Sequence, residues 1–199
     1  MVRDSMNKFD LFKQIETDPF KKGFRASGEG ALDRRHQKIV EAVPAESNVL
    51  EIGPGDGKLG VYFISKYQPY YMIDISKKRL FSFYEHIGNE MKTPCYVFEE
   101  PWEWEILECN IAQTVIAAEV IEHVDDYKWM INEMIRLSRG KVILTTPVGQ
   151  SFFSPDHKHF FSEEDFEFIE RPYTIEQIAT KESDYETGQR CFFIIIDAI

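Results

Sequence analysis

Carboxylate side chains follow four short apolar runs in this chain, at places where they could bind a ligand. The acids are Glu51, Asp74, the pair Glu99 and Glu100, and Glu119. In an open α/β sheet, the carboxyl ends of parallel strands line a crevice that holds nucleotide-like ligands. A carboxylate has two acceptor oxygens, so Asp74 could accept hydrogen bonds from both hydroxyls of a ribose. The pattern predicts an acid-lined crevice for a ligand that contains a nucleoside.

A glycine-rich segment follows the first of these acids. Gly53, Gly55 and Gly57 occupy alternate positions after the apolar run Val49–Ile52, and an amphipathic stretch comes next. Glycine permits a tight turn and lets the backbone approach a bound molecule, because no Cβ intervenes. This order predicts a strand, a turn and a helix, with a cofactor held at the turn.

The glycines fit two classes of cofactor. Gly55, Gly57 and Gly60 have the GxGxxG spacing of a dinucleotide-binding turn. Asp74 lies where that fingerprint has its ribose-binding acid. Glu51, however, would face the pyrophosphate of a dinucleotide and repel it. A cofactor without phosphate is therefore favoured, and a nicotinamide-dependent oxidoreductase is a distant alternative.

The segment from Glu51 to Gly57 (ExGxGxG) resembles motif I of the class I, Rossmann-like S-adenosylmethionine (SAM) methyltransferases. SAM carries a sulfonium cation beside a zwitterionic amino-acid end, which suits an acid near the turn. The resemblance implies that Asp74 binds the ribose. The implied cofactor-binding residues are Glu51, Gly53, Gly55, Gly57, Asp74, Ile75, Glu99, Glu100 and Glu119.

The adenine end of SAM has candidates after the third predicted strand. The resemblance implies that either Glu99 or Glu100 accepts the adenine amino group. Trp102 and Trp104 could cover the adenine face, although such aromatic residues are as often part of a core.

A second motif follows the fourth predicted strand. Glu119–Val124 reads EVIEHV and resembles the methyltransferase group that includes the ubiquinone-biosynthesis O-methyltransferases. The segments 145–147 (TTP) and 156–162 (DHKHFFS) match the same group. The small-RNA 2′-O-methyltransferases are more distant relatives in this resemblance. It implies methyl transfer to a hydroxyl oxygen.

The same motif could provide catalytic or metal-binding side chains. Glu119, Glu122 and His123 would share one face if the segment were helical. The resemblance implies a Mg²⁺ or Mn²⁺ site made of Glu119, Glu122, His123 and His157, with His159 as the alternative to His157, and carboxylate and imidazole groups suit such ions. The alternative is a structural motif in which Glu122 and His123 form hydrogen bonds within the fold. Without a metal, Glu119 stays in the predicted catalytic set, and His123, His157 or His159 could be the general base.

Apolar periodicity predicts alternating strands and helices. The expected strands are 48–52, 70–75, 95–98, 114–118, 141–145, 173–180 and 190–196. The expected helices are 5–16, 32–43, 80–87, 126–139 (stopped by Gly140) and 161–169. Alternation indicates a parallel sheet with both faces covered, and the last two strands, with no helix between them, should pair as a hairpin. The predicted fold is α/β, Rossmann-like and doubly wound, with a mostly parallel seven-stranded sheet that ends in an antiparallel β-hairpin.

Composition limits the classes of partner. The chain has 199 residues, a net charge of −11 and a pI near 5.0, so nucleic acid is an unfavourable partner. Three cysteines without a CxxC pattern argue against a disulfide framework or a cysteine zinc site. We expect residues 1–30 to form a helix and lid segment, in which Lys22 or Arg25 could meet SAM or the acceptor. Residues 31–199 should form the one catalytic domain.

Together these features predict a SAM-dependent methyltransferase that acts on the hydroxyl of a small molecule. No signal peptide or membrane-spanning run is evident, so the expected location is the cytoplasm. The alternatives are a metal-dependent RNA 2′-O-methyltransferase and a SAM-binding module without catalysis. The sequence does not determine the oligomeric state.

Overall fold

The computed structural model describes residues 32–55, 57–66, 69–76, 95–97, 104, 106–150, 154–180 and 188–199. Several predictions fall outside these residues. They are the helices 5–16 and 80–87, the segment 1–30 with its lid, and the cofactor candidates Glu99, Glu100 and Trp102.

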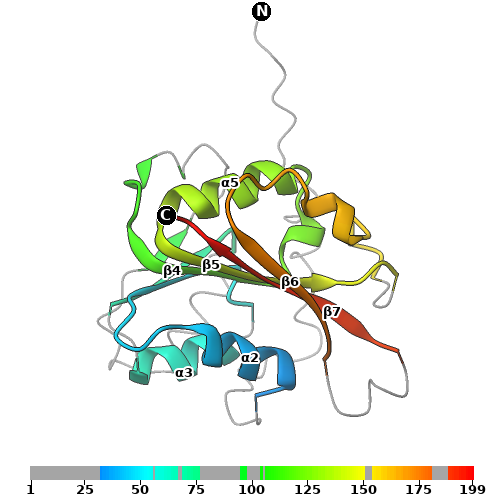
Figure 1. Ribbon diagram of the computed structural model, residues 1–199. Coiled ribbons are helices and arrows are strands. Elements are labelled where there is room, and N and C mark those ends of the chain that lie inside the picture. Colours follow the sequence, from blue (N-terminus) through cyan, green and yellow to red (C-terminus); the bar gives the residue numbers. More distant parts are fainter. Residues whose placement is uncertain are drawn as a thin grey trace, which may run out of the picture.

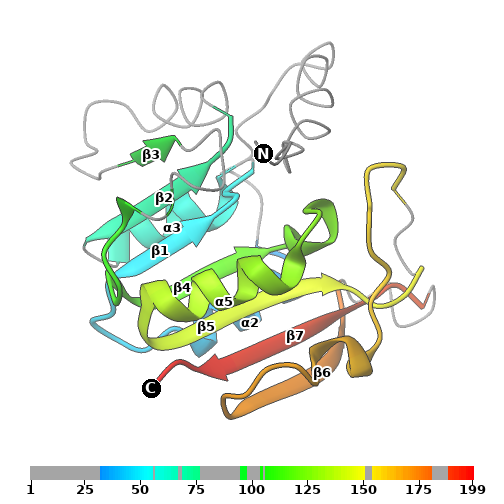
Figure 2. The same ribbon diagram turned by 90° about the horizontal axis from the view of Figure 1, so that it is seen from above.

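One twisted sheet runs through the described part of the chain, with the order β3-β2-β1-β4-β5-β7-β6 (Figures 1 and 2). Strands β1 to β5 are parallel to one another, whereas β7 is antiparallel to both β5 and β6. The strands are β1 Val49–Ile52, β2 Tyr70–Asp74, β3 Cys95–Val97, β4 Ala112–Ala118, β5 Ser138–Pro147, β6 Tyr173–Ala179 and β7 Arg190–Asp197. The prediction of a mixed α/β sheet with helices is confirmed.

Helices cover both faces of the sheet (Figure 1). Helices α2 (Arg34–Ala42) and α3 (Lys58–Lys66) lie on one face, and α5 (Tyr127–Leu137) lies on the other. The side chain of Asp33 caps α2 by accepting the N–H of His36 at 2.9 Å. Asp126 caps α5 in the same way, by accepting the N–H of Trp129 at 2.9 Å. Such caps satisfy backbone donors that the first helical turn leaves unpaired.

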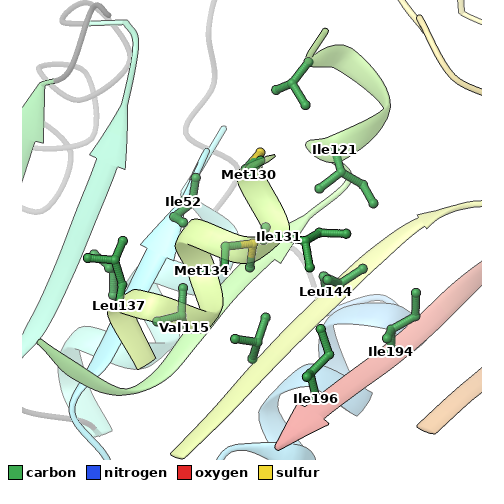
Figure 3. Close-up of a cluster of buried hydrophobic side chains, with 14 of the residues drawn as sticks. Ile52, Val115, Ile121, Met130, Ile131, Met134, Leu137, Leu144, Ile194 and Ile196 are labelled. Carbon is green, nitrogen blue, oxygen red and sulfur yellow. The ribbon is translucent and has the colours of Figure 1, made fainter. Parts of the chain in front are cut away.

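The core under α5 is built from one helical stripe and the apolar side chains of β4, β5 and β7 (Figure 3). The buried residues of the stripe are Met130, Ile131, Met134 and Leu137. Figure 3 shows them packed over Val115, Leu144 and Ile194. The opposite face is covered by α2 and α3, whose Ile39 and Phe63 are completely buried. Burial of each such side chain stabilises the fold by about 1.5–3 kcal/mol. The packing on both faces therefore holds the strands in place, and with them the strand ends that carry the site.

The predicted helix 126–139 is shorter than expected, and Gly140 is not its stop. The helix ends at Leu137, and β5 starts at the next residue. The Ser138 hydroxyl donates to the carbonyl of Lys141 at 2.8 Å and accepts the N–H of Gly140 at 3.2 Å, so it holds the extended start of the strand. Gly140 is needed for a close approach, because a Cβ there would lie 2.8 Å from the carbonyl oxygen of Gln113.

The predicted helix 161–169 is also wrong in extent. Only the 3₁₀ turn η5 (Glu163–Phe166) is helical. Ser162 precedes it as expected, and its N–H donates to the carboxylate of Asp165 at 2.8 Å. Phe166 is fully buried in the same core as the α5 stripe, where its ring contacts Phe161 and Phe192.

No helix in the described ranges is both long enough and apolar enough to cross a membrane.

We expect Gly140→Ala to destabilise the protein by about 1–3 kcal/mol, because the added methyl must displace the backbone of β4. Equilibrium unfolding in urea measures this change. Lys141→Ala, which removes atoms at the next position, is the matched control. An unchanged midpoint for Gly140→Ala would contradict the close approach.

Candidate functional site

The glycine turn after β1 needs its glycines for conformation and for space. Gly53, Gly55 and Gly57 have φ angles of +65°, +56° and +74°, a region that side-chain-bearing residues rarely adopt. A Cβ on Gly53 would also lie 2.7 Å from the Val120 side chain. The N–H of Gly53 donates to the carbonyl of Ile73 at 2.8 Å, which joins the turn to the end of β2.

A cavity lies where this turn, the end of β4 and helix α2 meet. Its lining residues are Arg35, His36, Glu51, Gly53, Pro54, Gly55, Lys58, Leu59, Ala118 and Glu119. Four predicted cofactor-binding residues therefore surround one cavity: Glu51, Gly53, Gly55 and Glu119. Gly57 is buried next to it in the same turn.

The buried acids Glu51, within β1, and Asp74, at the end of β2, are both held by hydrogen bonds. Glu51 is 2% exposed, and the Tyr70 hydroxyl donates to its carboxylate. Asp74 is 5% exposed and accepts the N–H of Ser76 at 2.9 Å. Ile75 is half-buried and packs against the core. Asp74 is the last residue of β2 and follows Ile73, whose carbonyl accepts the N–H of Gly53, so Asp74 lies next to the glycine turn.

Arg35 is a site residue that the sequence analysis missed. Its Nη1 lies 3.1 Å from Glu119 Oε2, and its Nη2 lies 3.1 Å from Asp33 Oδ2. Burial alone would lower the pKa of Arg35, but the two carboxylates raise it, so the guanidinium stays charged. Arg35 precedes Ile39 by four residues, and the buried face of that helix was the signal that could have found it.

Glu119 does not continue the helical turn that carries the rest of its motif. The residue has a φ of +57°, and helix η4 (Ile121–His123) begins only two residues later. The expectation that Glu119, Glu122 and His123 share one helical face is therefore wrong. Burial raises the pKa of Glu119, while Arg35 acts in the opposite direction. The positive φ aims the Glu119 side chain at Arg35 and the cavity.

Three of the four predicted metal-binding residues converge instead. One ligand atom from each of Glu122, His123 and His157 lies within 4.8 Å of the other two. Glu122 is 1% exposed, and its Oε2 accepts the Thr146 hydroxyl at 3.0 Å. Within the described ranges, Glu122 Oε1 and His157 Nδ1 are buried and have no hydrogen-bond partner. Burial, together with the charge of Glu119, raises the pKa of Glu122 well above its ordinary value.

Backbone hydrogen bonds bring His157 to this cluster. The N–H of Lys158 donates to the carbonyl of Glu122 at 2.7 Å, which ties the 154–160 segment to η4. The rings of His123 and His157 meet edge to face, with their centroids 4.8 Å apart. The downstream histidine motif is thus placed against the acids that follow β4.

His159 and Trp104, which were predicted to act in the site, make contacts that stabilise the fold. His159, a predicted general base, donates from Nε2 to the carbonyl of Val124 at 2.9 Å and packs its ring on Tyr127. It holds the segment and is not part of the three-residue cluster. Trp104 is 2% exposed and packs against Trp129 in the core under α5.

The arrangement was compared with known proteins. No protein-family model matches the chain, and no curated protein matches it. Solved structures do match at low identity. A SAM-dependent methyltransferase from Aquifex aeolicus is 14% identical, with a TM-score of 0.63, over 96% of this chain and 100% of that one. The N-methyltransferase NodS from Bradyrhizobium japonicum is 14% identical, with a TM-score of 0.64, over 82% and 93%.

A third structure extends the likeness to a liganded enzyme. The 1,6-didemethyltoxoflavin N1-methyltransferase of Burkholderia thailandensis, with bound 1,6-didemethyltoxoflavin and S-adenosylhomocysteine, is 13% identical with a TM-score of 0.66. The match covers 94% of this chain and 87% of that one. The chain has the fold of the class I SAM-dependent methyltransferases. The narrower resemblance to the EVIEHV group stays a prediction.

The raised pKa of Glu122 predicts a pH-dependent stability. The folded protein binds this proton more tightly than the unfolded chain, so the stabilisation is lost as the pH rises from the ordinary carboxyl range through the raised pKa. Glu122→Gln keeps the acceptor for Thr146 but does not ionise. We expect the wild type, in EDTA, to lose more stability than this variant between about pH 5 and about pH 8.

Urea unfolding at a series of pH values measures this difference. The exposed Glu108 provides the matched control, because Glu108→Gln removes a carboxylate that is not buried. Parallel pH profiles for the wild type and Glu122→Gln would contradict the prediction.

Proposed function

We propose that this protein is a SAM-dependent methyltransferase. The observation that carries the proposal is the cavity at the carboxyl edge of the sheet, where the glycine turn, Glu51 and the end of β4 meet. A methyltransferase fold and a cavity at this edge agree with the rule that open α/β sheets bind ligands there.

The charges around the cavity suit the amino-acid end of SAM. Glu51 and Glu119 are carboxylates that favour the sulfonium and ammonium groups. Arg35 and Lys58 line the same cavity and provide cations for the carboxylate of SAM. Asp74, one strand further along, would bind the ribose. This mixture of signs fits a zwitterion better than a pyrophosphate, which would meet two carboxylates.

The acceptor in this proposal is a hydroxyl of a small molecule. Methyl transfer from a sulfonium needs alignment of the reacting atoms, and a hydroxyl must also lose its proton. Glu119 lines the cavity, and its charge raises the pKa of Glu122, so the cluster is electrostatically coupled to the cavity. The net charge of −11 disfavours a nucleic-acid phosphate backbone as the main ligand.

The proposed location of this methyltransferase is the cytoplasm.

A divalent cation completes the proposed site, because the converging groups present lone pairs to one another. Glu122 Oε1 and His157 Nδ1 are buried without partners in the described structure, and His123 lies beside both. An imidazole and carboxylate set of this kind suits Mn²⁺ and, less strongly, Mg²⁺. Glu122, His123 and His157 would hold the ion, while Glu119 stays paired with Arg35. When bound, such an ion lowers the pKa of an acceptor hydroxyl and orients it.

Mn²⁺ should stabilise the wild type if these three residues hold it. At about 100 times its Kd, a bound ligand adds about 2.7 kcal/mol to the free energy of unfolding. Thermal unfolding with Mn²⁺ or with EDTA measures the gain, which Glu122→Gln and His157→Asn should reduce. Asp125→Asn, in an exposed acid close by, is the matched control. An equal gain in all four proteins would contradict this set of ligands.

Asp74→Asn should weaken the binding of S-adenosylhomocysteine by about tenfold to hundredfold, because a charged acceptor for the ribose is lost. Isothermal titration of the purified protein measures the affinity. Asp197→Asn changes another strand-end acid, at the opposite edge of the sheet, and should bind like the wild type. No binding of SAM or S-adenosylhomocysteine by the wild type, or tight binding of NADH, would contradict the proposed function.

The cluster of Glu122, His123 and His157 also supports a second candidate function, that of a metal-dependent RNA 2′-O-methyltransferase. Transfer of the labelled methyl group from SAM to catechols and small diols, compared with oligoribonucleotides, separates the two acceptors. A SAM-binding module without catalysis would bind the cofactor and label neither.

A further inference from the structure

The His123 ring is fixed on the side that faces away from Glu122. Its Nδ1 lies 3.2 Å from Asp156 Oδ2 and 3.3 Å from the backbone carbonyl oxygen of Asp156. A carbonyl oxygen and an ionised carboxylate oxygen can only accept hydrogen bonds. The proton of a neutral His123 must therefore be on Nδ1, which makes Nε2 the nitrogen with a lone pair.

The other ring nitrogen points toward the cluster. His123 Nε2 lies 3.9 Å from Glu122 Oε1, and the edge-to-face contact with His157 is on the same ring. A lone pair on Nε2 and an oxygen of the ionised Glu122 carboxylate cannot satisfy one another by a hydrogen bond. Both are suited to a cation between them, so the tautomer of His123 decides whether the cluster can bind one.

Asp156 is itself held by local contacts. The hydroxyl of Ser154 donates to Asp156 Oδ1. The N–H of His157 donates to the carbonyl of Ser154 at 3.0 Å, which closes the turn around Asp156. The carboxylate is therefore oriented toward His123 before any ligand arrives.

We propose that Asp156 is a positioning residue, which keeps the proton of His123 on Nδ1 and so presents Nε2 to the cation site. This inference rests on the divalent cation of the proposed function. Carboxylates that accept the second ring N–H of a metal-binding histidine fix the ring and raise its basicity, and their loss weakens metal binding by about tenfold to hundredfold.

The test combines a tautomer measurement with a metal titration. Nitrogen-15 NMR of the metal-free protein, at a pH where the ring is neutral, reports which nitrogen of His123 carries the proton. The chain has five histidines, and a His123→Asn variant assigns the signal. We expect the Nδ1–H tautomer in the wild type and a shift toward the Nε2–H tautomer in Asp156→Ala.

Isothermal titration with Mn²⁺ should show binding about tenfold to hundredfold weaker in Asp156→Ala than in the wild type. Asp156→Asn, which keeps an acceptor oxygen for Nδ1–H, should fall between them and serves if the alanine variant does not fold. Asp125→Ala is the matched control. It removes the same charge from a residue whose carboxylate pairs with Lys158 of the same segment at 2.6 Å.

The outcomes separate this inference from the proposed function. An unchanged His123 tautomer in Asp156→Ala, or equal Mn²⁺ affinity in Asp156→Ala and Asp125→Ala, would overturn the positioning role. A wild type that binds no Mn²⁺ would overturn the cation site and the ligand role of Nε2. The SAM-binding proposal would stand in that case, because the titration of S-adenosylhomocysteine tests it independently.

Discussion

The burial of the Glu122 carboxylate is the constraint on which this end of the molecule depends. Its side chain accepts the hydroxyl of Thr146 at the end of β5, and its carbonyl accepts the N–H of Lys158. One residue thus joins the sheet, the turn after β4 and the downstream histidine segment. A buried carboxylate is costly unless a proton, a hydrogen bond or a cation compensates it. Thr146 provides a hydrogen bond to the Glu122 carboxylate, and His123 and His157 lie beside it where a cation could bind.

The elements that local pattern alone determines could be predicted. The apolar runs that became β1 and β2 are bounded by turn residues, and the stripe of α5 has a clear helical period. The errors come from tertiary contacts. Gly140 looks like a helix terminator, but it is used for the approach of β5 to β4. The segment 161–169 has a capping residue, yet only one turn forms, and its Phe166 is buried in the core that α5 covers.

The residues of the candidate site also fall into two groups: those that sequence motifs predict and those that depend on tertiary contacts. Motif spacing predicted a site at Glu51, Gly53 and Gly55, and these residues line one cavity. It also predicted that His157 lies near Glu122, as it does in the structure. Motif spacing did not indicate Arg35, for which the buried face of its helix was the available signal. It also did not indicate the hydrogen bond between Asp156 and His123, which joins residues far apart in the chain. Glu119 shows the limit most directly: its spacing suggested a helical face, while its positive φ turns it toward a guanidinium of the helix that precedes β1.

That last ion pair has a consequence for where the folding unit starts. Strand β1 is the first strand of the sheet, and a fragment cut by strand boundaries would begin there. Such a fragment would keep every strand but lose Arg35, which neutralises Glu119 at the far end of β4. The smallest fragment that preserves the carboxyl edge of the sheet must therefore include α2, although that helix contributes no strand and no motif.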